Sequence, residues 1–142
     1  MKGKLFIIEG GDGSGKATQT RLLTEHLQCD GYDVKSVSYP DYDSDSSALV
    51  KMYLRGDFGS DADAVNPYAA SAFFAVDRFA SYQMKWKAFY EQGGIVIADR
   101  YTTSNMLYQT IKIDDPDQRR AYLSWLEDFE FHKMGLPAPD KV

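Results

Sequence analysis

Residues 10–16 read Gly-Gly-Asp-Gly-Ser-Gly-Lys, a glycine-rich run that ends in a lysine. The run fits the pattern G-x-x-x-x-G-K, in which backbone N–H groups and the lysine hold the phosphates of a ligand. Glycine lets the backbone curl around one phosphate, and the start of the following helix adds partial positive charge. We therefore predict a polyphosphate site. Its contacts are predicted to be Gly10, Gly11, Asp12, Gly13, Ser14, Gly15, Lys16, Ala17 and Thr18.

Ala17 stands directly after the lysine, where the pattern places a Ser or Thr that binds Mg²⁺. Mg²⁺ is then held mainly by phosphates, water and a carboxylate such as Asp99, through water, or the hydroxyl of Thr18 takes the role. A damaged site is the third alternative. The sequence leaves all three open.

Short apolar or alternating runs at 5–8, 33–39 and 95–98 predict three strands. Helical spacing or helix-start signals predict helices from Lys16 toward Gly31 and at 48–54, 67–92 and 117–131. Because strands alternate with helices, we predict an α/β fold with a parallel sheet flanked by helices and ligands at the carboxyl ends of the strands. The glycine loop, residues 40–42 and residues 99–100 all lie at such ends.

The composition is that of one ordinary globular domain of 142 residues, with 44% hydrophobic and 26% charged residues. The apolar runs are too short for a signal peptide or a membrane span, so we expect a cytoplasmic protein without a membrane partner. A net charge of −5 argues against a nucleic-acid partner and favours a small nucleotide.

Further motifs follow the glycine loop in order: Tyr39-Pro40-Asp41-Tyr42, then F-x-x-x-R, then D-R-Y followed by S-N and Y. With E-G-x-D-G-x-G-K-x-T-Q at residues 9–19, they make the chain similar to thymidylate kinases from Lys4 to its C-terminus. The resemblance implies a three-layer P-loop NTPase fold, ATP as phosphoryl donor, Mg²⁺, and dTMP as the acceptor that becomes dTDP. It also implies a homodimer that forms through helix packing.

The resemblance implies that Asp12 reaches the deoxyribose of the acceptor. A carboxylate suits a sugar hydroxyl better than a phosphate, because like charges repel; a turn-stabilising aspartate is the alternative. Tyr42 is implied to hydrogen-bond the acceptor phosphate, and an ordinary surface tyrosine is the alternative.

Phe74 and Arg78 form the F-x-x-x-R motif and lie on one face of the predicted helix. In similar enzymes this pair holds thymine, with the ring stacked on the base and the guanidinium bound to its edge. The spacing alone also fits an amphipathic helix with core and rim positions. Phe73 and Phe79 are expected to lie in the core.

Asp99 and Arg100 are predicted, with Lys16, to be catalytic. The carboxylate lies near the metal or the attacking phosphate, and the guanidinium can bind the acceptor phosphate through two hydrogen bonds; a surface ion pair is the alternative. The acceptor site is further predicted to include Ser104, Asn105 and Tyr108. Asn105 can pair with a pyrimidine edge, Ser104 is alternatively a helix cap, and Tyr108 is implied to exclude a ribose 2′-hydroxyl.

The resemblance implies that residues 1–142 are one nucleoside monophosphate kinase domain without a mobile lid and without the strands that follow the third one. Residues 139–142 resemble the start of the next central strand. We expect the chain alone to fold poorly and to show little kinase activity. A kinase for another nucleoside monophosphate or a deoxynucleoside is one alternative, and a P-loop protein that binds nucleotide without transferring phosphate is another.

Overall fold

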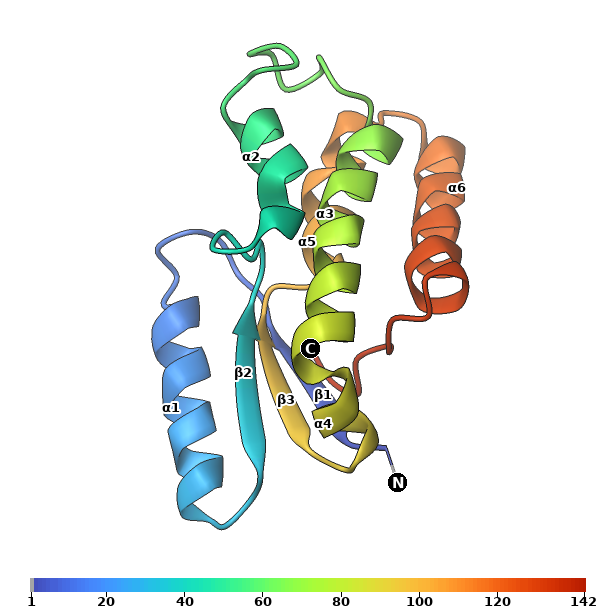
Figure 1. The fold of residues 1–142 in the computed structure, drawn as a ribbon. Helices are drawn as coiled ribbons and strands as arrows, with labels where there is room; N and C mark the ends of the chain where they lie inside the picture. The colour runs from blue at the N-terminus through green and yellow to red at the C-terminus, as the bar shows by residue number, and fades with distance from the viewer. Residues whose placement is uncertain (1) are drawn as a thin grey trace.

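A parallel sheet of three strands lies at the centre of the computed structural model, which describes residues 2–142 (Figure 1). The strands are β1 (Lys4–Ile8), β2 (Val34–Ser38) and β3 (Ile95–Asp99), in the spatial order β1-β3-β2. Both neighbours pair with β3 in parallel, from Ile95 to Asp99. The three predicted strands and their parallel arrangement are confirmed.

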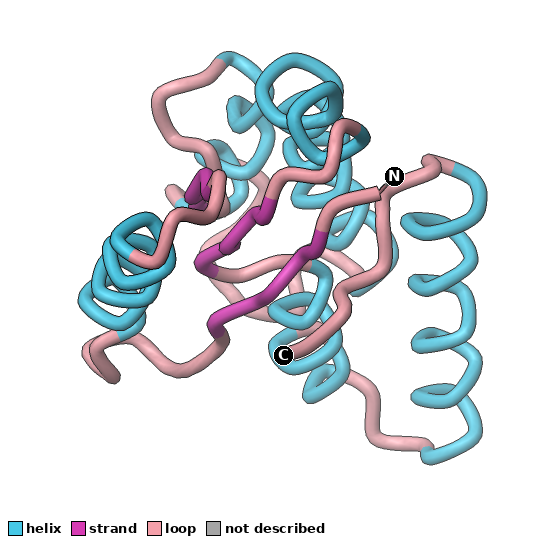
Figure 2. Tube along the Cα trace, turned by 90° about the horizontal axis from the view of Figure 1, so that it is seen from below, coloured by secondary structure: helices cyan, strands magenta, loops and turns pink. Residues whose placement is uncertain are grey.

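Helices cover both faces of this sheet. They are α1 (Lys16–Cys29), α2 (Ala48–Leu54), α3 (Pro67–Ser81), α4 (Lys87–Glu91), α5 (Thr102–Tyr108) and α6 (Pro116–Glu127). Figure 2 shows α1 on one face and α3 with α4 on the other. The predicted three-layer α/β architecture is confirmed, and among residues 2–142 no helix has the length and apolar character needed to cross a bilayer.

The starts of α3 and α6 follow the same local rule. The side chain of Asn66 accepts a hydrogen bond from the N–H of Ala69 at 3.0 Å, and that of Asp115 accepts one from Gln118 at 2.9 Å. Each cap is followed by a proline in the first turn, where no N–H is needed.

The long helix predicted at 67–92 is present, but a π-helical turn at Tyr82–Trp86 joins α3 to α4. The turn directs two side chains toward the segment after β2: the indole N–H of Trp86 donates to the Tyr39 hydroxyl at 2.8 Å, and Lys85 pairs with Asp41. A second π-helical turn, Asp128–Lys133, extends α6 and carries Glu130. Such turns are often found at functional sites.

Helix α5 was not predicted, because residues 102–108 lack apolar side chains at helical spacing. A helix this short depends on tertiary contacts, which local sequence does not show. The prediction that Phe79 lies in the core is wrong: its side chain is on the outer face of α3 and is 36% exposed.

The main core lies between the sheet and the helix pair α3–α4. Leu5, Ile7, Val96 and Ala98 pack there against Tyr82, Trp86, Tyr90, Tyr101 and Leu136. The final residues run beside β1, where Asp140 N–H donates to Leu5 O at 2.8 Å and Ile7 N–H to Lys141 O at 2.9 Å. This isolated parallel bridge places Lys141 beside Phe6 of β1. That residues 139–142 begin the next strand stays a prediction.

Candidate functional site

The glycine loop joins β1 to α1 and has the backbone that a phosphate site requires. Gly13 and Gly15 have φ values of 77° and 90°, which glycine adopts without strain. Ser14 closes the loop, since its N–H and hydroxyl both donate to Gly11 O, at 3.2 and 2.6 Å. The loop residues are exposed to solvent, so an anion can reach them.

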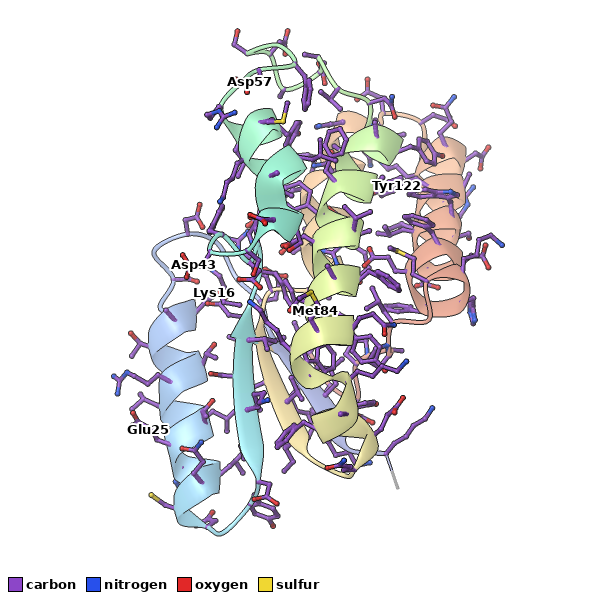
Figure 3. All side chains as sticks on the ribbon, in the orientation of Figure 1. Lys16, Glu25, Asp43, Asp57, Met84 and Tyr122 are labelled. Carbon is purple, nitrogen blue, oxygen red and sulfur yellow. The ribbon has the colours of Figure 1, made fainter. Side chains whose placement is uncertain are left out.

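Lys16 is the first residue of α1 and lies at the carboxyl ends of the strands (Figure 3). Its ammonium group donates to Gly11 O at 3.2 Å and lies 4.0 Å from the Asp12 carboxylate. Ala17 and Thr18 follow on the exposed first turn of the helix. The loop therefore offers one positive charge and a helix start to a phosphate.

Arg100 reaches across to this loop from the end of β3. One of its Nη atoms lies 2.7 Å from the Asp12 carboxylate, and the guanidinium lies 5.3 Å from the centre of the Tyr108 ring. Arg100 is the one non-glycine residue with positive φ, 68°, among residues 2–142. A non-glycine residue in this region is uncommon and marks a local constraint.

Asp99 precedes Arg100 and is partly buried. Burial raises the pKa of its carboxyl, and the positive charges of Lys16 and Arg100 oppose this effect. The negative charge of Glu9 adds to the effect of burial, so the pKa of Asp99 lies above its usual value. Glu9 and Asp99 thus bring two carboxylates to the ends of neighbouring strands. Such hard oxygen donors fit Mg²⁺.

A cavity of about 660 Å³ connects the glycine loop to the helices above the sheet. Its volume is within the range of small-molecule sites. It brings together every residue predicted for the acceptor site, as well as Lys16 and Asp99. The predicted residues in its wall are Asp12, Lys16, Tyr42, Phe74, Arg78, Asp99, Arg100, Ser104, Asn105 and Tyr108.

Phe74 forms part of the apolar wall of this cavity. Its ring meets Tyr53 edge to face, with centroids 6.1 Å apart and planes at 85°. Tyr42 and Tyr108 are exposed at the cavity and come from the loop after β2 and from α5. The cavity therefore has aromatic side chains at several positions where a base or sugar can pack.

Arg78 also borders the cavity, but its side chain is 2% exposed and paired with Glu130, which is fully buried. Nε and Nη2 donate to the two carboxylate oxygens at 2.7 and 2.8 Å. Burial opposes the charge of Arg78, but the attraction and hydrogen bonds of Glu130 outweigh it and raise the pKa of the guanidinium. Much of its donor capacity is therefore used inside the protein.

Helix α5 carries Ser104 and Asn105. The Ser104 hydroxyl donates to Glu9 at 2.9 Å, beside Thr103 at 2.7 Å, and the Asn105 amide donates to Ser71 O at 3.3 Å. Ser104 lies inside the helix, which begins at Thr102, so the alternative that it caps the helix is wrong. Glu9 instead ties α5 to the strand that leads into the glycine loop.

Several cavity residues had not been predicted: Tyr53, Asp77, Gln109 and Lys112. Gln109 directly follows the last motif tyrosine, and its Oε1 atom is buried with no hydrogen-bond partner among residues 2–142. A buried acceptor without a partner is costly unless a ligand supplies the donor. Its position next to Tyr108 was the one available signal.

The fold and the site together define a class. A parallel sheet with a glycine loop between β1 and α1, and a lysine at the first turn of that helix, is the arrangement of a P-loop nucleotide-binding protein. The cavity lies at the carboxyl ends of the same strands, where open α/β sheets bind their ligands.

Comparison with known proteins names the family. The family profile described as thymidylate kinase matches residues 8–128. The thymidylate kinase of Mycobacterium tuberculosis is 31% identical over 137 residues, which are 96% of this chain and 62% of that protein. A probable thymidylate kinase of Pyrococcus horikoshii is 33% identical over 109 residues, 77% of this chain and 53% of that protein. The chain belongs to the thymidylate kinase family.

Solved structures agree with this assignment. The thymidylate kinase of Candida albicans superposes with a TM-score of 0.72 at 28% identity, covering 98% of this chain and 60% of that one. The enzyme of Ehrlichia chaffeensis gives 0.70 at 26% identity, covering 99% and 69%. The chain therefore spans about three fifths of the length of the curated relatives that it matches most fully.

Proposed function

We propose that this chain provides the donor loop and the acceptor site of an enzyme that transfers the terminal phosphoryl group of ATP to dTMP. The observation that carries the proposal is the shared cavity: Lys16 and Asp12 of the glycine loop line the same space as Phe74 and Arg100. Phosphoryl transfer requires the two phosphates to meet in line, so donor and acceptor sites must open into one space.

The dTMP phosphate is itself a nucleophile, so the reaction needs positioning and charge neutralisation more than a strong base. Lys16 and the loop N–H groups hold the ATP phosphates in this proposal, and Arg100 leaves Asp12 to bind the acceptor phosphate through its planar fork. Asp12 is then free to accept a hydrogen bond from the deoxyribose. Its side chain is 98% exposed, so the exchange costs little.

Mg²⁺ is proposed to bind beside Asp99, directly or through water. When bound, it would neutralise charge on the donor phosphates. Ala17 offers no hydroxyl, and Thr18 is the nearest hydroxyl along the helix. Ala17→Ser tests this arrangement: a large gain in Mg²⁺-dependent nucleotide affinity would mean that the native loop lacks a metal ligand, and no gain would mean that phosphates and Asp99 suffice.

The base is proposed to lie against Phe74, within reach of Arg78, Asn105 and Gln109. The buried Oε1 of Gln109 needs a donor, which the ring N–H of thymine can supply. Ser104, Tyr42 and Tyr108 line the same cavity. In this proposal Tyr42 contacts the acceptor phosphate and Tyr108 lies beside the sugar.

The test is a comparison of acceptors. The protein should phosphorylate or bind dTMP in preference to dCMP and AMP, with dUMP the nearest competitor. A kinase for another monophosphate would reverse this order, and a nucleotide-binding protein without transferase activity would bind ATP and dTMP but form no dTDP in any longer form of the chain. The family assignment does not favour either alternative.

A homodimer and a cytoplasmic location complete the proposal. Leu49 of α2 and Val76 and Phe79 of α3 expose apolar side chains on two helices that pack together. A second copy of the chain can cover these side chains through helix packing. The missing lid and the low activity of the chain alone stay predictions.

A further inference from the structure

Glu130 is a fully buried carboxylate at the back of the acceptor cavity. It lies in the π-helical turn after α6 and pairs with Arg78 of α3, 52 residues away in sequence. The hydroxyl of Thr102, the first residue of α5, also donates to its Oε1 atom at 2.8 Å. One carboxylate therefore connects the π-helical turn to α3 and α5, two helices whose residues line the cavity.

The pairing with Glu130 fixes the orientation of the Arg78 guanidinium and limits the hydrogen bonds that it can donate to a ligand. A guanidinium has five N–H groups in one plane. Glu130 takes the Nε–H and one Nη2–H, and the Tyr101 carbonyl lies 3.4 Å from Nη1. Arg78 borders the cavity, and these three contacts leave two of its five N–H groups for a ligand. The guanidinium plane cannot turn without breaking both short hydrogen bonds to Glu130.

The pairing also balances the charge. A buried guanidinium without a partner would be strongly unfavourable, while a paired one presents donors with little net charge. Such a surface suits a neutral acceptor atom, a carbonyl oxygen, better than an amino group, which would set donor against donor.

We propose that Glu130 is a positioning residue for recognition of the acceptor base. It holds Arg78 in the orientation that meets a pyrimidine carbonyl, and it thereby sets the preference for a 4-keto pyrimidine over a 4-amino pyrimidine. This inference rests on the proposed function, because it assumes that the cavity holds a pyrimidine nucleotide.

The first test is equilibrium binding of dTMP, dCMP and ATP to the protein and to its Glu130→Gln variant. Glutamine keeps the shape but offers one oxygen and one amino group, so one N–H of Arg78 meets another donor. Glu127→Gln is the matched control, because Glu127 is exposed at the end of α6, directly before the turn that carries Glu130.

We expect Glu130→Gln to weaken dTMP binding at least about tenfold and to lower the dTMP-to-dCMP affinity ratio, with ATP affinity unchanged. Glu127→Gln should behave as the parent. A purely structural role would weaken all three ligands together and leave the ratio unchanged, which would overturn the proposal. Equal dTMP affinity and ratio in both variants would also overturn it.

Failure of the proposed function gives a different result. If the parent chain does not bind dTMP, the function and this inference fall together; if the parent binds it and Glu130→Gln binds it equally, only the inference falls.

A second measurement needs no variant and covers the case in which Glu130→Gln does not fold. Arginine side-chain NMR of the parent chain should show a hindered Arg78 guanidinium whose Nη signals shift on dTMP addition, while its Nε signal stays. Arg78 signals that do not change at saturating dTMP would overturn the proposal.

Discussion

Arg100 combines a strained backbone with an exposed partner. Its φ of 68° is costly for any residue except glycine, and its ion partner Asp12 is almost fully in water. Exposed pairs contribute little to stability, so the protein does not gain this conformation for stability. The strain is consistent with a residue held for function, where local constraint is tolerated.

Replacing Arg100 with glycine should therefore separate stability from binding. We expect the unfolding temperature of Arg100→Gly to be at least as high as that of the parent. Arg100→Ala should be less stable than Arg100→Gly by about 1 kcal/mol, because alanine keeps the backbone strain. Both should lose most dTMP affinity. Thermal denaturation and dTMP titration check this, and an alanine variant as stable as the glycine variant would mean that the backbone is not strained.

Asp41 gives the chain a pH-dependent contact at the loop after β2. Burial disfavours the charged carboxyl, but hydrogen bonds from Lys85 and Ser44 and the charge of Lys85 outweigh burial and lower its pKa. A lowered folded pKa means that the contact stabilises the fold above about pH 4, the usual value for an unfolded aspartate, and is lost as pH falls through the folded value.

Asp41→Asn should then lower the free energy of unfolding near neutral pH and have little effect in strong acid. The loss should stay below about 1 kcal/mol, since Lys85 is about half exposed. Urea denaturation at both pH values measures it. An equal loss at both would assign the effect to the backbone of the loop rather than to the charge.

The sequence predicted a functional role for single residues where they belong to a motif or contact residues that are near in the chain. The glycine loop, Phe74 and Arg100 are brought to one cavity as their motifs implied. Glu130 was not predicted, because its partner Arg78 lies on another helix and a lone glutamate in a helical segment gives no local signal of burial. Gln109 was also missed, because the burial of its side chain has no signal in the sequence beyond its position next to Tyr108.

Among the elements, α3 positions the loop after β2 through one buried carboxylate. Asp77 accepts hydrogen bonds from the Asp41 N–H at 2.8 Å and the Ser46 hydroxyl at 2.6 Å. Its side chain is almost fully buried and lines the cavity. The loop that carries Tyr42 is thus held by α3 in addition to its own turn, in which the Ser44 N–H donates to Asp41 O at 3.0 Å.

Asp77→Ala should free this loop while leaving the rest of the fold in place. Without the carboxylate the Asp41 N–H loses its partner, so we expect faster amide exchange at residues 41–46 and unchanged exchange in α1. Hydrogen exchange measures this, with the exposed Asp43→Ala as control. Unchanged exchange at 41–46 in Asp77→Ala would mean that other contacts hold the loop.

At the level of elements, buried strands and capped helices were predictable and α5 was not. The apolar runs of β1 and β3 and the caps of α3 and α6 are local signals that agree with the final structure. Helix α5 depends on hydrogen bonds from Thr103 and Ser104 to Glu9, 94 and 95 residues away. Contacts of that range are set by the whole fold.

The molecule exposes apolar side chains on both of its outer faces. The face formed by α2 and α3 exposes Val76 with 39% of its surface accessible, and α1 on the other side of the sheet exposes Leu22 with 45%. If the α2–α3 face pairs two copies, Val76→Asp should produce monomers in sedimentation experiments, and Leu22→Asp should not. Dimers that persist in Val76→Asp would remove this face as the interface.

In the proposed enzyme the donor and acceptor nucleotides bind in one cavity, and titration of the protein with dTMP tests this arrangement. With ATP binding measured in parallel, Phe74→Ala should lose at least about tenfold in dTMP affinity because a stacked aromatic wall is removed, and ATP affinity should not change. Tyr32→Ala, an exposed aromatic outside the cavity, should match the parent. Unchanged dTMP affinity in Phe74→Ala would mean that the acceptor does not bind in this cavity.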